Sequence, residues 1–119
     1  MQRYLVIKVH VSEFPEPISF GEGALLKVGE RYEGDEGWED WFFCEVPGHP
    51  GGWVPRQLLA WVDKQTAVAK SSYTARELNV HPGEHVSSDR EINGWRWCVR
   101  EEDGTEGWVP VSNLQLESS

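Results

Sequence analysis

The tetrapeptide GWVP occupies residues 52–55 and recurs letter for letter at residues 107–110. The match extends well upstream of it, where two further stretches align in the same order: residues 18–26 (ISFGEGALL) with 78–86 (LNVHPGEHV), and 41–44 (WFFC) with 95–98 (WRWC). The spacing between the copies changes only in turn-rich segments, where differences in length cost little free energy. The sequence therefore predicts that one small structural unit is present twice.

Each repeat is typical of an all-β unit. Apolar residues alternate with polar ones in YLVIKVHV (residues 4–11) and LKVGERY (residues 26–32), which is the period of a strand. Turn dipeptides separate the strands, including NG at 93–94 and DG at 103–104. Several short strands in such a small unit indicate a closed barrel, because closure removes exposed sheet edges. The seven tryptophans supply the large rings that so small a core needs.

Composition restricts the possible partners. Eleven basic and 20 acidic residues give a net charge of −9, so a phosphate backbone would be repelled and nucleic acid is not expected as a partner. No targeting or membrane-spanning segment is apparent, and two cysteines are too few for a disulfide scaffold. We therefore expect a cytoplasmic protein without membrane association, and a basic or neutral partner.

No catalytic or metal-binding pattern stands out. His81 and His85 have a metal-like spacing, but Pro82 and Gly83 between them indicate a turn without further ligands. Cys44 and Cys98 occupy the same position in both repeats, which favours core packing over a reactive thiol. We therefore expect no enzyme activity, no cofactor and no metal.

The second repeat resembles a Src-homology-3 (SH3) domain of the bacterial variant type. The resemblance rests on Tyr73-Thr-Ala, on Pro82-Gly-Glu, on Asn93-Gly-Trp95 and on Gly107-Trp-Val-Pro110, and the first repeat is similar over residues 18–26 and 41–59. It implies two SH3-like five-stranded barrels in tandem, at residues 3–62 and 66–117. In the family, the positions of Trp41 and Trp95, and those of Pro55 and Pro110, line a shallow groove for proline-rich peptides.

Both repeats depart from the family at the other walls of this groove. The resemblance places one groove tyrosine at Ser71 and near Val11, and the other at Asn113 and Leu58, so two aromatic walls are missing. Other residues could compensate. Trp97 lies two residues after Trp95 and thus on the same face of a regular strand, and Glu36, Glu39 and Asp40 lie beside Trp41, where carboxylates could hold Lys or Arg.

These observations leave three functional hypotheses open. The first is a protein-interaction module that binds a basic, proline-containing or otherwise extended peptide. The second is a structural adaptor whose barrels pack on each other and whose tryptophans serve only the core. The third is recognition of a cell-wall peptide or glycan. Fold alone does not separate them, and the oligomeric state stays open.

Overall fold

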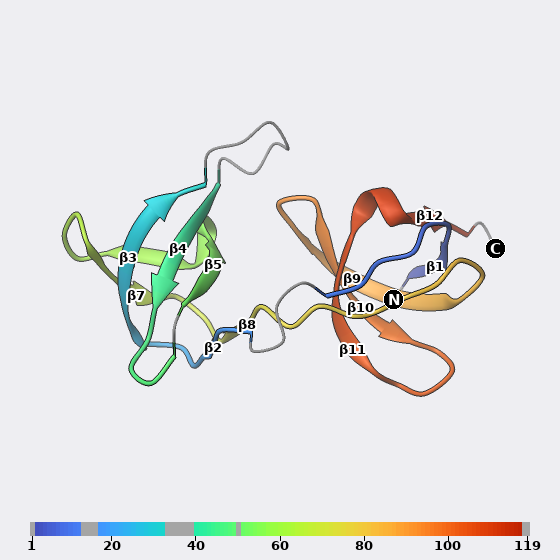
Figure 1. The fold of residues 1–119 in the computed structure, drawn as a ribbon, viewed down its shortest axis with the longest axis horizontal. Coiled ribbons are helices and arrows are strands. Elements are labelled where there is room, and N and C mark those ends of the chain that lie inside the picture. The colour runs from blue at the N-terminus through green and yellow to red at the C-terminus, as the bar shows by residue number, and fades with distance from the viewer. Residues whose placement is uncertain (1, 13–16, 33–39, 50, 118–119) are drawn as a thin grey trace. The chain divides into compact units, whose positions relative to one another are not determined.

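The computed structural model describes residues 2–12, 17–32, 40–49 and 51–117. The structure is all-β in this part of the chain, where the helical segments are two short 3₁₀ turns. It divides into two compact units (Figure 1). The central unit is Glu16–Ala75, and the split unit combines Met1–Pro15 with Arg76–Ser119.

The central unit contains a five-stranded antiparallel sheet in the order β5-β4-β3-β7-β6. A separate two-stranded pair joins β2 to β8. The elements in chain order are β2 (Ser19–Phe20), β3 (Leu25–Arg31), β4 (Trp41–Glu45), β5 (Gly52–Pro55), the 3₁₀ turn η1 (Arg56–Leu58), β6 (Leu59–Trp61), β7 (Thr66–Ala69) and β8 (Tyr73–Thr74).

The split unit repeats this arrangement with the order β11-β10-β9-β1-β12. In place of the β2–β8 pair, it has an isolated antiparallel bridge between His10 and Val80. Its elements are β1 (Gln2–Val6), β9 (His85–Ile92), β10 (Trp95–Arg100), β11 (Glu106–Pro110), the 3₁₀ turn η2 (Val111–Asn113) and β12 (Leu114–Leu116).

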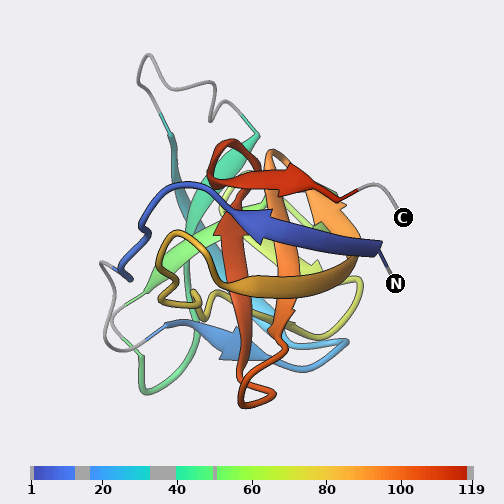
Figure 2. The same ribbon diagram turned by 90° about the vertical axis from the view of Figure 1, so that its right-hand side faces the viewer.

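The two repeats exchange their first strands. The strand β1 of the first repeat lies between β9 and β12 of the second repeat, as Figure 2 shows. Reciprocally, β7 of the second repeat lies between β3 and β6 of the first. The registers are equivalent, because Val6 pairs with Leu114 as Ala69 pairs with Leu59.

This exchange corrects the boundaries expected from the sequence. Residues 3–62 and 66–117 mark the two sequence repeats, whereas each compact unit takes strands from both. Each unit still has its own core, as predicted. In the split unit, Leu78 and Val80 pack in one buried cluster with Val86 and Val109, and Tyr4 and Val6 of the first repeat complete it.

Local sequence explains the turns. The predicted Asn-Gly hairpin joins β9 to β10, where Asn93 has φ +48° and Gly94 has φ +85°. Two successive positive φ values define the two-residue turn whose twist matches the strands, and Asn and Gly adopt them most readily.

The prediction of full closure is wrong: among the described residues no ladder joins the end strands β11 and β12, or β5 and β6, so each unit is an open five-stranded sheet.

Candidate functional site

The structure brings the predicted tryptophan and proline of each repeat together. Trp95 lies opposite Pro110 in the β10–β11 ladder, and Trp41 lies opposite Pro55 in the β4–β5 ladder. The two pairs occupy equivalent places in the two units. Residues 41 and 55, and residues 95 and 110, therefore form two candidate sites of the same architecture.

These tryptophans are less exposed than a stacking surface requires. Trp41 is 6% exposed and Trp95 is 9% exposed. Trp97 is half-buried, and its ring packs edge-to-face on Trp108 at a centroid distance of 5.3 Å. Burial of these rings therefore serves packing first, and any ligand would meet their edges.

The two sites differ in how open they are. Pro55 is fully buried, whereas Pro110 is half-buried. Since a ligand can only contact atoms that solvent reaches, the split unit offers the more accessible of the two Trp–Pro pairs.

A histidine completes the site in the split unit, and sequence reasoning missed it. The His10 ring meets the Trp95 ring edge-on, with 5.4 Å between centroids and 77° between planes. Its Nε2 atom lies 2.7 Å from Glu77 Oε1, a contact that needs a proton on Nε2 because the carboxylate accepts. These side chains are 15% and 9% exposed. We call His10, Glu77, Trp95 and Pro110 the split-unit site.

The strand exchange explains why the sequence did not reveal this site. His10 comes from the first repeat, whereas Trp95 and Pro110 come from the second. The exchange also corrects the placement of the missing groove wall. Ser71 belongs to the central unit, and the strand registers make Lys8, rather than Val11, its equivalent in the split unit.

The expected acidic partners of Trp41 are only partly described. Glu36 and Glu39 lie outside the described residues. Asp40 is half-exposed, and its Oδ1 atom lies 3.6 Å from Arg56 Nε. The Arg56 backbone N–H also donates to the Asp40 carbonyl at 2.7 Å. Asp40 therefore already faces a cation of its own unit.

Exposed apolar side chains flank the split-unit site. Val9 and Val11, on either side of His10, are 51% and 60% exposed, and Val111, next to Pro110, is 36% exposed. Ile7, two residues before Val9, is 49% exposed. We call these four residues the apolar strip. Their equivalents in the central unit are polar or charged: Lys70, Ser72, Thr74 and Arg56.

The described residues hold no group of three or more metal-ligating side chains, and no helix among them is long and apolar enough to cross a membrane. Cys44 and Cys98 are fully buried. Burial raises the pKa of the Cys44 thiol to about 12 and that of Cys98 to about 11, which keeps both thiols protonated and unreactive. A shallow hollow of about 480 Å³ lies beside Leu25, Pro47 and Thr66, and none of the predicted site residues lines it.

Comparison with known families agrees with the sequence repeat. Neither the curated proteins nor the solved structures contain a match for this chain. The sequence model of the variant SH3 domain, in contrast, matches it twice, over residues 3–62 and 66–117. SH3 domains are in general non-catalytic modules that bind segments of other proteins. The chain therefore belongs to the variant SH3 domain family and carries that domain in tandem.

Proposed function

We propose that this chain is a non-catalytic protein-interaction module in which the split-unit site binds an extended segment of a partner protein. Family membership supports the general class. The apolar strip is the observation that carries the assignment to one unit. Ile7, Val9 and Val11 expose apolar side chains at every second residue of one segment, and gathered exposed apolar side chains commonly mark a binding site. The central unit has polar residues at the same positions and serves as an internal control.

Charge favours a basic segment as the ligand. Each unit carries more acidic than basic residues, and the whole chain has a net charge of −9. Electrostatic attraction would raise the encounter rate with Lys- or Arg-containing partners and would weaken as salt rises. The ligand that fits best is therefore an extended peptide with apolar side chains for the strip and at least one basic side chain.

The test is a peptide titration followed by amide shifts in NMR spectra, with basic apolar peptides and their acidic counterparts. The double variant Val9→Ser/Val11→Thr copies the residues of the central unit. It should weaken binding about thirtyfold, since each valine contributes on the order of 1 kcal/mol when the ligand covers it. Leu116→Ser is the matched control, because Leu116 is 53% exposed in the same unit but lies outside the strip.

Substitution of the tryptophans would not give a clean test. Trp41 and Trp95 are almost fully buried, so truncating either ring would destabilise its unit by about 3–5 kcal/mol. His10→Ala is the better probe of the site itself. If the peptides shift no resonances of the split unit, or if the strip variant binds as tightly as the parent, the proposal is wrong.

The burial of Trp41, Trp95 and Pro55 favours a second candidate, a structural adaptor whose family site serves only the fold. The same titration separates the two candidates. An adaptor of this kind would leave the amide resonances of both units unchanged with every peptide.

A further inference from the structure

The exchanged strands carry side chains of very different size. The inward-facing residues of β1 are Tyr4 and Val6, which are 9% and 1% exposed. The equivalent residues of β7 are Ala67 and Ala69, which are 0% and 2% exposed. One repeat therefore begins with a bulky strand and the other with a slim one, although both strands fill the same place in their units.

The receiving sheets compensate for this difference. Ala67 lies opposite Trp61, whose ring meets Phe42 edge-on at 5.3 Å between centroids. At the equivalent place in the split unit, Tyr4 lies opposite Leu116. Trp61 and Leu116 are 45% and 53% exposed, so this difference in size lies at the surface edge of each pair.

The same compensation appears deeper in each core. The central unit has Leu26, Val28 and Leu58 on the strands and turn that surround slim β7, and all three are buried. The equivalent residues around bulky β1 are smaller or polar: Val86, Ser88 and Asn113.

An arginine in the split unit packs over the Tyr4 ring. Arg96 places its Cζ atom 4.9 Å from the Tyr4 ring centroid. Its Nε atom donates to Ser88 Oγ at 3.0 Å, and its Nη1 atom pairs with Glu91 at 2.9 Å. The central unit has Phe42 at this place. The position of Tyr4 is thus fixed by partners that only the split unit provides among the described residues.

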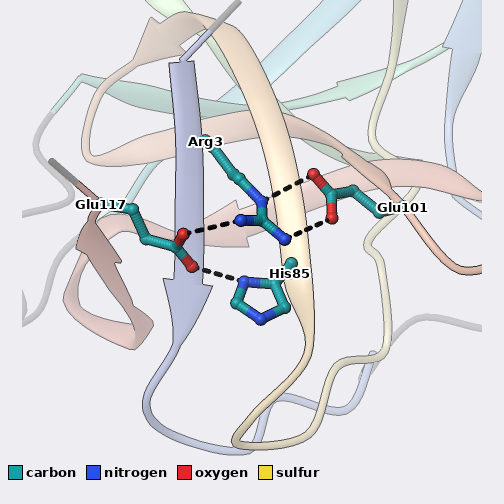
Figure 3. Close-up of polar contacts among 4 residues, drawn as sticks. All are labelled: Arg3, His85, Glu101 and Glu117. Carbon is teal, nitrogen blue, oxygen red and sulfur yellow. Dashed lines mark hydrogen bonds and ion pairs between the residues drawn. The ribbon is translucent and has the colours of Figure 1, made fainter. Parts of the chain in front are cut away.

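Charge distinguishes the two places as well. Arg3 on β1 lies between two carboxylates of the split unit, as Figure 3 shows. Its Nε atom lies 2.8 Å from Glu101 Oε1, and its Nη1 atom lies 3.1 Å from Glu117 Oε2. Glu117 also contacts His85 Nδ1. The equivalent residues of the central unit are all uncharged: Thr66, Pro47, Val62 and Leu25.

We infer that the side chains of β1 and β7 specify the reciprocal exchange, so that each strand fits the unit built by the other repeat better than its own. In the unexchanged arrangement, Tyr4 would lie against the buried Leu26, and Ala67 would leave a gap beside the buried Val86. Arg3 would face Leu25 and Val62. Neither sequence repeat is then a self-sufficient domain. The split-unit site exists only in the tandem, because its two halves come from different repeats.

Disulfide trapping in the full chain tests the arrangement. Leu5 pairs with Gln115 in the structure, and it would pair with Ala60 if the strands were unexchanged, because Val68 holds that place. The variants Leu5→Cys/Gln115→Cys and Leu5→Cys/Ala60→Cys differ only in the second site. Oxidation of dilute protein should link 5 to 115 within one chain at least about tenfold faster than 5 to 60. Cys44 and Cys98 are buried and should not compete.

A transposed variant tests whether the side chains are the cause. It exchanges the three distinguishing residues between the strands and leaves the overall composition unchanged: Arg3→Thr, Tyr4→Ala and Val6→Ala together with Thr66→Arg, Ala67→Tyr and Ala69→Val. The trapping preference should invert, so that 5 links to 60. The inference is overturned if the parent links 5 to 60, if 5 links to 115 only between two chains, or if the transposed variant keeps the 5–115 link or fails to fold.

Discussion

The split unit and the central unit share a strand order and a Trp–Pro register, yet they distribute bulk in opposite ways. In the split unit, the exchanged strand is large and the surrounding sheet is small, with Tyr4 opposite Leu116. In the central unit, the exchanged strand is small and the sheet is large, with Ala67 opposite Trp61. Around the exchanged strand, buried bulk is therefore compensated within a unit and not within a sequence repeat.

The surfaces of the two units differ in the same complementary way. Beside the exchanged strand, the split unit has a charged cluster around Arg3, whereas the central unit exposes Leu25 and Val62, which are 62% and 64% exposed. Near the candidate sites the contrast reverses, because the split unit has the apolar strip and the central unit has polar residues. Units that share a fold therefore present different chemistry at equivalent places, and among the described residues the apolar strip belongs to the split unit alone.

The largest expected effect is on thiol reactivity, and it compares the two cores directly. In the native protein, an alkylating reagent should label Cys44 and Cys98 at least about a hundredfold more slowly than in denaturant. As pH rises, Cys98 should react first, because its pKa is about 11 and that of Cys44 is about 12. Mass spectrometry of timed aliquots gives both rates.

The same thiols make alkaline solution destabilising. Burial raises both pKa values above the ordinary 9.0, so their contribution to stability is complete below pH 9 and is lost as pH rises toward the folded values. Rapid labelling of either cysteine under native conditions would show that its core is open, and it would contradict the conclusion that both units have closed cores.

Removal of the large ring from the exchanged strand should have the next largest effect. Tyr4→Ala should destabilise the split unit by about 3 kcal/mol, because it leaves a cavity and removes the ring under Arg96. Hydrogen exchange, read separately for amides of each unit, should show the loss in β9 and β12 but not in β3 and β6. Leu116→Ala is the control, since its exposed side chain should contribute less than about 1 kcal/mol. Equal loss in both units would contradict independent cores.

A smaller effect is expected where glycine allows another segment of the chain to approach a strand closely. A Cβ atom at Gly107 would lie 2.6 Å from the Leu78 backbone nitrogen, whereas one at Gly52 would lie 2.8 Å from the Ile18 Cγ2 atom. Backbone yields less readily than a side chain, so Gly107→Ala should cost about 2 kcal/mol and Gly52→Ala about 1 kcal/mol. Thermal unfolding of the two variants measures the difference, and the reverse order would show that Ile18 is the more rigid neighbour.

Sequence reasoning reached the repeat and the strand content because each depends on local pattern. Alternation and the Asn93-Gly94 turn act over a few residues, and GWVP ends a strand in the same way in both copies. The exchange could not be predicted from local pattern, because β1 and β7 show the same alternation of side chains and either strand can pair in either unit. The sequence nevertheless contains a signal for the exchange. Tyr4 and Val6 are much larger than Ala67 and Ala69, and the other strands of each repeat do not offset this difference in side-chain volume.

Only part of the candidate site was predicted. Trp95 and Pro110 belong to one repeat and were found from its resemblance to the family. His10 and Glu77 are separated by 67 residues and meet only through the exchange. The exposure of the tryptophans depends on how neighbouring strands cover them, which no local pattern reports.

The smallest expected effect concerns acid stability, and it tests the charged cluster around Arg3 beside the exchanged strand of the split unit. The hydrogen bonds from the Arg3 guanidinium lower the pKa of Glu101 below its ordinary 4.5, with His85 adding a smaller electrostatic contribution. A carboxyl whose pKa is lower in the folded than in the unfolded state stabilises the protein at pH values above the unfolded pKa. This stabilisation is lost as pH falls through the folded pKa, so the contribution of Glu101 should disappear below about pH 4.5.

In Arg3→Gln the split unit should therefore lose less stability on acidification than it does in the parent. Part of the acid dependence should remain, because Arg100 lowers the pKa of Asp103 in the same unit by an independent pair of hydrogen bonds. The central unit should respond equally in both proteins, since Thr66, Pro47, Val62 and Leu25 carry no charge at the equivalent places. Amide exchange measured from pH 6 down to about pH 3 follows each unit separately. If parent and variant lose protection in parallel, the Arg3 contacts do not stabilise the exchanged strand, and the specification would have to come from the size of Tyr4 and Val6 alone.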